Sequence, residues 1–461
     1  MNATGAPVSQ TCAAGQHRLP SRAMIRGTTE RGRCSSRRTA HPLGVTARRV
    51  ARALLMAIGF APTVALAAPE FAVSGYGTLG YARSDDDLRY LRYIDNEGTI
   101  KADSLVGVQF EARFDPKWGA TVQAVASAPR TRDSGYEAAV RWAFVSFRPQ
   151  NDWLFRAGRL RPPVLINTQN AEVGVTYDQA RLPVEVYSLS PVYDADGGAV
   201  TKTWALGEAE LSLDGYWGLT KINYHLPFQR FDDRTYLPER ITLMGLVLSY
   251  TSESLLLRAG IHRAVTRFTG DQPIEETFAP IQIPAPPPVG GDLYVPFNPL
   301  DRVHITVFTL GADWHMGDWR ITGEYGQRII RDTKIGPSSK GAYLTVARSI
   351  GKWTPYVTYA RLLSGSEART LYQTLNNTPV PLAALGPPRF LPTTYHAILA
   401  DQIVAYDQYS TMLGASYSFS ATSKIKVEWM RTHVGLVSAL VDGDVHHKSF
   451  NVYSVSYSVA F

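Results

Sequence analysis

Cysteine is nearly absent from this chain of 461 residues, and both copies, Cys12 and Cys34, lie close to the N-terminus. Residues 68–461 therefore offer no disulfide framework and no thiolate ligand for a metal ion. A cysteine-free segment suits a chain that crosses an oxidising compartment unfolded, where stray thiols would cross-link.

Long apolar runs are missing as well. No stretch after Ala67 approaches the apolar length of a transmembrane helix, and sustained helical periodicity is lacking in the same part of the chain. The sequence therefore argues against a helical membrane protein and against a helical bundle.

The N-terminal part has the features of a secretion signal. Arg48, Arg49 and Arg52 precede the apolar run Ala53–Phe60, which is too short for a spanning helix, and a small-x-small cleavage motif follows at 65–67. We expect a signal peptide at 47–67, with cleavage between Ala67 and Ala68. Residues 1–46 form a basic, low-complexity extension, either a misassigned start or a disordered segment, and we favour the first.

Acidic residues are almost absent before the expected cleavage site. Residues 1–67 hold ten arginines, no lysine and one acid, Glu30, so their formal charge is +9, whereas the formal net charge of the whole chain is +7. The remaining chain is 7 − 9 = −2, and the basic balance belongs to the leader. This charge distribution excludes nucleic acid as the expected partner.

Catalytic motifs are also lacking: the chain has no G-x-S-x-G elbow, no H-E-x-x-H and no Walker loop. The segment 75–80 (GYGTLG) matches G-x-G-x-x-G, but we interpret it as a glycine-rich strand because no helix is expected after it. The segment 442–447 (DGDVHH) is either a surface metal site or a solvated loop, and we favour the loop. The prediction is no enzyme, no cofactor and no metal.

What the chain does contain is alternation of apolar and polar residues over segments of about ten residues. It is clear in 424–429 (KIKVEW), in 106–114 (VGVQFEARF) and in 320–325 (RITGEY). Such a strand has one face in apolar surroundings and one in water. A soluble sandwich and a membrane barrel both produce this pattern, so alternation alone does not separate them.

The connections separate these two folds, because short links alternate strictly with long ones. Strands are predicted near 71–82, 102–114, 118–128, 137–148, 152–160, 197–204, 209–217, 243–251, 254–265, 303–314, 318–328, 340–350, 353–363, 404–418, 422–433 and 449–461. Long loops are predicted near 83–101, 129–136, 161–196, 218–242, 266–302, 329–339, 364–403 and 434–448. The prediction is an all-β, transmembrane, antiparallel up-and-down β-barrel of about sixteen strands, with short periplasmic turns and long external loops.

Aromatic residues flank the short turns, as expected for a girdle at one membrane interface. Four follow a turn and four precede one: Trp118, Trp153, Trp319 and Trp353, then Phe114, Phe147, Trp314 and Phe419. The chain ends on an alternating strand that closes with Phe461. An even strand count lets this last strand pair with the first, which leaves no open edge in lipid.

With these features the chain resembles Gram-negative outer-membrane porins over essentially all of residues 68–461. The Gly158-Arg159 pair ends the fifth predicted strand and is followed by the long loop 161–196, the element that those proteins fold inward as a constriction. The resemblance implies a homotrimer in the outer membrane with periplasmic termini, in contact with lipid and lipopolysaccharide. It also implies that Phe461 is part of the C-terminal signal read by the barrel-insertion machinery.

Candidate pore-lining residues follow from the alternation and from the resemblance. On the walls, Arg141, Arg156 and Arg258 are expected to face inward near mid-strand, and Arg113 near the periplasmic end. In the loop the acids are Glu172, Asp178 and Glu185, which are more spread out than the clustered acids of trimeric porins. Basic walls that face an acidic loop would impose a transverse field on polar solutes. The alternative is that these residues simply face water in a wide barrel.

The expected function is passive diffusion of small hydrophilic solutes and ions through a water-filled barrel that loop 161–196 narrows. A substrate-specific channel of similar architecture is the first alternative. A barrel enzyme or adhesin is the second, because fold does not fix function. A plugged transporter would need an N-terminal plug domain, whereas the first predicted strand begins at Phe71.

Overall fold

The computed structural model describes residues 69–129, 132–190, 192, 194–226, 235–269, 274–385 and 391–461. The chain divides into two compact units, 1–64 and 65–461, and only the second contains described residues. The predicted extension, the signal peptide and the cleavage site between Ala67 and Ala68 lie outside the described residues.

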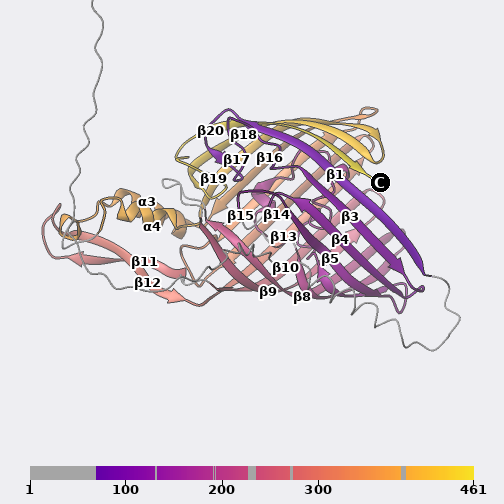
Figure 1. The fold of residues 1–461 in the computed structure, drawn as a ribbon, viewed down its shortest axis with the longest axis horizontal. Helices are drawn as coiled ribbons and strands as arrows, with labels where there is room; N and C mark the ends of the chain where they lie inside the picture. Colours follow the sequence, from indigo (N-terminus) through magenta and orange to yellow (C-terminus); the bar gives the residue numbers. More distant parts are fainter. Residues whose placement is uncertain are drawn as a thin grey trace, which may run out of the picture. The chain divides into compact units, whose positions relative to one another are not determined.

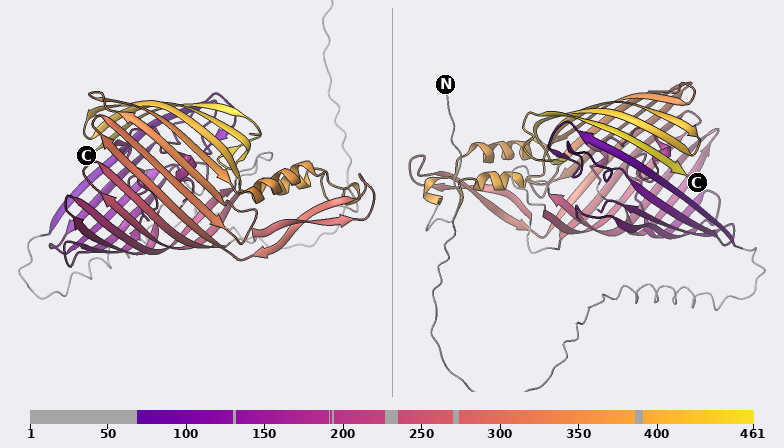
Figure 2. Two further views of the ribbon diagram at one scale, coloured as in Figure 1. Left: turned by 180° about the vertical axis from the view of Figure 1, so that it is seen from behind. Right: turned by 45° about the horizontal axis from the view of Figure 1, so that its top comes forward.

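In the described part of the chain, sixteen strands form one closed antiparallel barrel (Figure 1). Figure 2 shows the same tilted strands from two further sides. The strands are β1 (Glu70–Ser84), β3 (Leu105–Arg113), β4 (Trp118–Ser127), β5 (Glu137–Phe147), β6 (Trp153–Leu160), β7 (Ala195–Leu206), β8 (Ala209–Leu226), β9 (Thr235–Thr251), β10 (Leu255–Phe268), β13 (Arg302–Met316), β14 (Trp319–Ile330), β15 (Ser339–Arg348), β16 (Trp353–Ser364), β17 (Tyr406–Ser420), β18 (Ser423–Ser438) and β20 (Ser449–Ala460). The predicted fold class is confirmed, and each predicted strand overlaps an observed one.

Helices in this part of the chain are few and short, and none of them has both the length and the apolarity to cross a bilayer. The glycine-rich segment 75–80 lies within β1, so its interpretation as a strand is confirmed. Short turns contain glycines with positive φ, among them Gly207 and Gly317, a conformation that other residues adopt only with strain.

The alternation sorts side chains between the two faces of the barrel wall. In β9, Leu243 and Val247 point inward and are buried, whereas Leu246 and Leu248 point outward and are exposed. The predicted loop 218–242 was too long, because β8 continues to Leu226 and β9 begins at Thr235. Apolar residues there occupy the inward face as well as the outward one, which hides the period of two from the sequence.

Five of the predicted loops contain secondary structure of their own. The proline-rich loop 266–302 forms a hairpin of β11 (Ile274–Ile283) and β12 (Gly291–Leu300), a two-stranded ribbon whose edges tolerate proline. Outside loop 161–196 the other loop elements are β2 (Arg89–Tyr90) paired with β19 (Val441–Asp442), α3 (Ser366–Asn377), η2 (Leu382–Ala384) and α4 (Tyr395–Asp401). Phe278 of the hairpin packs in one apolar cluster with Leu375 and Leu399 of the helices.

The barrel closes between β1 and β20. Tyr76 pairs with Ala460, and beyond this pair the backbone N–H of Gly75 donates to the carbonyl of Phe461 at 2.9 Å, while Phe461 N–H donates back at the same distance. A Cβ built on Gly75 would lie 2.4 Å from the Phe461 ring, so the terminal ring lies directly over this glycine. The last residue of the chain is therefore part of the seam.

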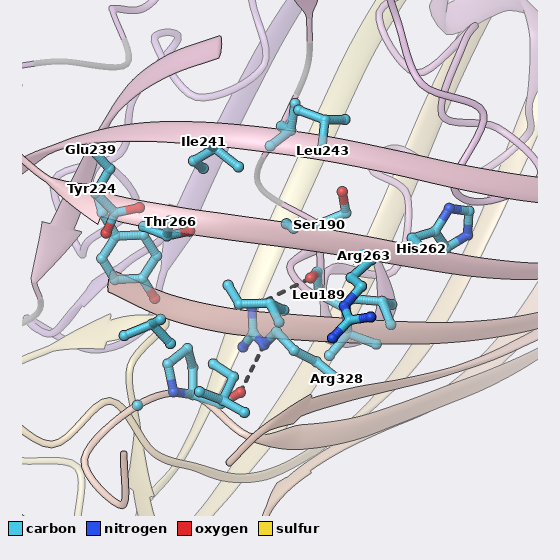
Figure 3. Close-up of a pocket in the computed structure, with 18 of the residues that line it drawn as sticks. Leu189, Ser190, Tyr224, Glu239, Ile241, Leu243, His262, Arg263, Thr266 and Arg328 are labelled. Carbon is cyan, nitrogen blue, oxygen red and sulfur yellow. Dashed lines mark hydrogen bonds between the residues drawn. The ribbon is translucent and has the colours of Figure 1, made fainter. Parts of the chain in front are cut away.

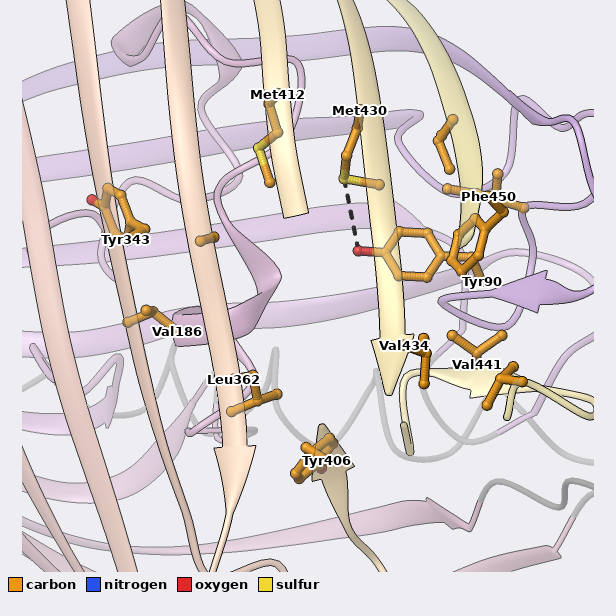
Figure 4. Close-up of a cluster of buried hydrophobic side chains, with 14 of the residues drawn as sticks. Tyr90, Val186, Tyr343, Leu362, Tyr406, Met412, Met430, Val434, Val441 and Phe450 are labelled. Carbon is orange, nitrogen blue, oxygen red and sulfur yellow. Dashed lines mark hydrogen bonds between the residues drawn. The ribbon is translucent and has the colours of Figure 1, made fainter. Parts of the chain in front are cut away.

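Part of the barrel interior is an apolar core rather than open water. Val186 lies in one cluster with Leu362 and Met412 on the inner wall, and Tyr90 reaches Met430 with an O–S distance of 4.0 Å (Figure 4). A water-filled lumen narrowed by loop 161–196 was expected, but the alternation does not reveal which inward positions another segment covers. These inward apolar side chains are covered by loops that enter the barrel from its long-loop side.

Candidate functional site

The segment 161–194 leaves and rejoins the wall at one point, since Leu160 and Ala195 are direct partners in the β6–β7 ladder. It contains η1 (Gly174–Thr176) and α2 (Val184–Tyr187). Its side chains and carbonyls contact inward-facing residues of strands on opposite sides of the ring. The segment therefore lies inside the barrel, held from several sides.

The first contact is an ion-pair cluster around Glu172. Its carboxylate accepts from Arg141 Nε at 3.2 Å and from Arg161 Nη2 at 2.5 Å, and all three side chains are buried. Arg141 Nη1 also lies 3.5 Å from Asp194. Arg141 stands at a register shift where β4 and β5 lose their regular pairing, and a bulge of this kind re-aims a side chain.

The second contact holds Asp178 against the opposite wall. Its Oδ1 accepts from Lys424 Nζ at 2.7 Å and from the Ser416 hydroxyl at 2.7 Å, and Arg320 lies 3.8 Å away. Burial raises the pKa of Asp178, but the Lys424 ammonium, these hydrogen bonds and Arg320 lower it by more, so the net shift is downward. Asp178 therefore keeps its charge and ties the loop to β17 and β18.

The third contact is Glu185 in α2, whose side chain is completely buried. One carboxyl oxygen accepts from Gln408 Nε2 at 2.9 Å and from the Ser410 hydroxyl, while the other has no partner in the described structure. Burial raises the pKa of Glu185, and the two hydrogen bonds offset only part of this rise. The expectation that Glu185 lines the pore as an exposed acid is wrong, because α2 packs this side chain against β17.

The remaining predicted arginines have different partners. Arg258 donates from Nη1 to the loop carbonyl of Leu165 at 3.0 Å, so it supports the loop directly. Arg156 faces Asp214 of β8 at 3.7 Å. Arg113 lies at the end of β3, highly exposed and 3.7 Å from Glu70, so the structure does not bring it to the loop.

These contacts change the expected electrostatics. The prediction placed basic walls and acidic loop residues across open water from each other. Instead, Glu172 and Asp178 are in direct contact with wall cations, and Glu185 is buried among neutral donors. A carboxylate and a guanidinium attract each other strongly at low dielectric, so a loop that reaches the wall forms pairs rather than a separated field.

Between the loop and the wall formed by β1, β3 to β6, β8, β18 and β20, the lumen holds a cavity of about 700 Å³. Cations and acids line it in nearly equal numbers: Arg92, Arg141, Arg159, Arg181, Lys221 and Lys426, with Asp103, Glu137, Glu172, Asp194 and Asp442. Both signs of charge and several tyrosines thus face the same space. A space lined in this way can hold water and small polar solutes.

Sequence reasoning missed three loop supports. Arg181 forms a two-pronged pair with Asp103, with its Nε 2.8 Å from Oδ1. Lys426 Nζ donates to the Gln179 carbonyl at 2.9 Å and lies 3.8 Å from the centre of the Tyr177 ring. Alternation marked Lys426 as inward, but only a folded loop could identify its partners.

No cluster of three or more potential metal ligands occurs among the described residues. In the segment 442–447, Asp442 pairs with Arg89 in the small β2–β19 sheet, and His446 Nδ1 lies 3.2 Å from the carbonyl oxygen of Leu436. Local backbone contacts therefore account for the position of this segment.

Replacing Glu185 with Gln is expected to strengthen loop docking at neutral and alkaline pH. Because the folded-state pKa is raised, the stabilisation from docking is complete below the unfolded pKa and is lost as pH rises through the folded pKa. The neutral amide removes this loss. Hydrogen exchange of the α2 amides, followed by mass spectrometry, should show protection that falls with pH in the wild type and stays flat in Glu185→Gln. Equal pH profiles would contradict the assignment, and Glu172→Gln, which breaks a charged pair, is the matched control.

No family model and no curated protein matches the chain. Among solved structures it is similar to OmpT of Vibrio cholerae in its trimer form, with 12% identity, a TM-score of 0.48, and coverage of 86% of this chain and 100% of that chain. It is also similar to an anion-selective porin from Comamonas acidovorans, with 12% identity, a TM-score of 0.47, and coverage of 85% and 100%. OprB of Pseudomonas putida is a third, with 10% identity, a TM-score of 0.47, and coverage of 86% and 94%.

Proposed function

We propose that this protein is an outer-membrane channel through which small hydrophilic solutes and ions diffuse passively, and that loop 161–196 narrows its lumen. The observation that carries the proposal is the cavity of about 700 Å³ between the loop and the barrel wall, lined by charges of both signs. Water and polar solutes are stabilised in such a space, whereas an apolar filling would exclude them.

The outer face of the barrel supports a membrane location. Large apolar side chains are exposed there on strand after strand, as in Phe110, Leu246, Leu310, Leu344 and Val427. Such a band would be unfavourable in water but suits the hydrocarbon of a bilayer.

Aromatic pairs occur next to the short turns on the same outer face. The rings of Trp118 and Phe147 are 4.4 Å apart, and those of Trp353 and Tyr417 are 4.8 Å apart. Indole and phenol rings favour the boundary between lipid and water. We therefore place the short turns, and with them both ends of the barrel chain, at the periplasmic interface, with lipid and lipopolysaccharide around the barrel.

The proposal extends to assembly. A leader that ends near Ala67 would direct export, the insertion machinery would recognise the strand ending at Phe461, and three copies, each with its own lumen, would associate as a homotrimer. Catalysis is not part of the proposal. Both ring nitrogens of the inward-facing His262 are occupied, one at 2.7 Å from the Tyr216 hydroxyl and the other at 3.2 Å from Thr309 Oγ1.

Planar-bilayer recordings of the purified protein test this function. Stepwise, ohmic conductance with reversal potentials that respond to a salt gradient is the expected result. A protein that inserts with normal heat-modifiability but never raises the membrane conductance would refute it. A substrate-specific channel is the second candidate, favoured by an apolar cavity beside Leu243 inside the barrel.

Replacing Arg141 and Arg156 with Ser is expected to raise the preference for cations, because Glu172 and Asp214 would each lose a cationic partner. The double variant is also expected to be less stable than the wild type. Arginines that only face water would contribute little stability, whereas Arg141 pairs with a buried carboxylate. Leaving the buried Glu172 with one partner fewer costs about 1–3 kcal/mol. Reversal potentials and thermal unfolding of the double and single variants measure both effects. Unchanged selectivity with unchanged stability would contradict the role of these pairs.

A further inference from the structure

A second cavity lies on the inner wall where β8, β9, β10, β13 and β14 meet the loop (Figure 3). Its volume is about 120 Å³. Most of its lining is apolar and comes from inward positions of the strands and from the loop, chiefly Leu189, Val192, Ile241, Leu243, Val307 and Ile330.

This lining is unexpected in a wall that only has to hold water. Ile241, Leu243 and Ile330 are inward-facing and nearly inaccessible to solvent. An inner wall that serves conduction alone is polar, as in open channels. Dry apolar cavities of roughly 150 Å³ hold a six-carbon ring such as benzene. The size and lining therefore point to a ligand with a small branched or cyclic hydrocarbon body.

Most polar groups at this cavity are already engaged. The guanidinium of Arg328 donates to the Pro337 carbonyl at 2.7 Å and to the Ser339 hydroxyl at 3.2 Å, and it reaches loop carbonyls as well. The His262 ring is held between two hydroxyl groups. Arg263 borders the cavity, but it is exposed and lies on the outer face of β10 together with Ile261.

Three polar side chains remain, namely Ser190 of the loop and Glu239 and Thr266 of neighbouring strands. Thr266 is 2% exposed, and its Oγ1 is buried without a hydrogen-bond partner in the described structure. Glu239 also lines the cavity, and no hydrogen bond or ion pair to its carboxylate occurs among the described residues. The unpaired hydroxyl of Thr266 is buried, which is costly, and the half-buried carboxylate of Glu239 faces the same cavity. Both oxygens can accept a hydrogen bond, which favours a ligand that supplies donors.

The strand register brings these two groups together. Thr266 pairs with Ile241, and Phe268 pairs with Glu239, so Thr266 and Glu239 are diagonal neighbours on one face. Diagonal neighbours in an antiparallel pair are about 7–8 Å apart at the backbone, and the longer glutamate side chain shortens that span. One ammonium group can therefore donate to both oxygens while its hydrocarbon body lies against Ile241 and Val303, the ladder partners of Thr266 on its two sides.

We propose that this cavity is a binding site for small organic cations, namely primary amines with a compact aliphatic or aromatic body, held by Glu239 and Thr266. The proposal deepens the proposed channel function, on which it rests for the route of entry through the lumen. The channel would then distinguish primary amines from its other solutes, because an amine that occupies this site also narrows the space beside the loop.

Calorimetric titration of the purified, detergent-solubilised protein with benzylamine tests the site. Benzyl alcohol and benzoate serve as neutral and anionic probes of the same shape. Benzylamine is expected to bind best, and Glu239→Gln to weaken its binding about tenfold or more, because a charge-assisted hydrogen bond is lost. Thr266→Val should weaken it to a smaller degree, and Leu243→Trp, which fills the cavity, should abolish it.

Glu210→Gln is the matched control, because Glu210 is an exposed acid at the opposite end of the barrel in β8 and should leave binding unchanged. Equal binding of the three probes, equal binding of benzylamine to wild type and Glu239→Gln, or no binding would overturn the proposal. Heat-modifiability reports folding of each variant, and Glu239→Gln decides the outcome if Leu243→Trp does not fold.

Bilayer recordings on the same preparations separate this site from the channel function. A conducting protein that fails to bind benzylamine refutes the amine site and leaves the channel intact. A protein that binds benzylamine through Glu239 but does not conduct refutes the channel and leaves the site. Partial block of the current by benzylamine, relieved in Glu239→Gln, would support both.

Discussion

Deleting Phe461 is expected to lower the amount of assembled barrel several-fold while export of the chain continues. The residue closes the seam through two backbone hydrogen bonds with Gly75, each 2.9 Å long, and its ring covers that glycine. Without it, the N–H and carbonyl of Gly75 in β1 lose their partners at the seam, and unpaired backbone groups are costly in a membrane. Heat-modifiability of outer-membrane fractions measures the assembled barrel, and antibody detection of soluble chain measures export.

A second variant tests the contact apart from the terminal signal. Gly75→Leu keeps Phe461 but places a Cβ within 2.4 Å of its ring, so the ring has to move away from the seam. Assembly should fall in this variant too, whereas Phe461→Tyr, which keeps an aromatic ring, should assemble normally. If the chain without Phe461 reaches wild-type levels of barrel, the residue has no role in closure.

Replacing residues 161–194 by a two-residue turn is expected to raise single-channel conductance several-fold. The direct pairing of Leu160 with Ala195 allows a tight turn to close the β6–β7 hairpin without distorting the barrel. Removing the loop opens the cavity across the lumen, and a wider aqueous path carries more current. The variant should also be less stable, because burying each large apolar side chain such as Val186 or Leu189 contributes about 1.5–3 kcal/mol.

Shortening the tip of the β11–β12 hairpin between 284 and 290 is the matched control. This tip belongs to another long loop and makes none of the contacts described for segment 161–194 in the lumen. Its conductance should equal that of the wild type. If removing 161–194 leaves conductance unchanged, the narrowest part of the lumen lies elsewhere and the loop serves only as a core.

Much of the barrel could be predicted from sequence because strand formation leaves a local signature. In 424–429, the period of two fixes which side chains share a face, and β18 is found there. The same signature failed at 218–242, where β8 and β9 place apolar residues on both faces. The hairpin at 274–300 was also missed, because this proline-rich stretch was predicted as part of a long loop, whereas the edges of an isolated two-stranded ribbon accept proline.

The site residues show more clearly what could not be predicted from the sequence. Alternation placed Arg141 and Arg258 on the inward face, but it could not show that Arg141 contacts Glu172 or that Arg258 holds the carbonyl of Leu165. Those partners are 31 and 93 residues away in the chain, and no local pattern encodes contacts at that separation.

The sequence by itself determined the all-β class, the strand order and the sorting of side chains between inner and outer faces, because each depends on neighbours within about ten residues. Only the tertiary structure decided what fills the barrel. The path of the loop sets whether an inward side chain faces the charged cavity, as Glu137 does, an ion-pair partner, as at Asp178, or an apolar cavity, as at Leu243. These outcomes depend on which distant segments share the lumen, and burial and pairing energies are set by that juxtaposition rather than by the local chain.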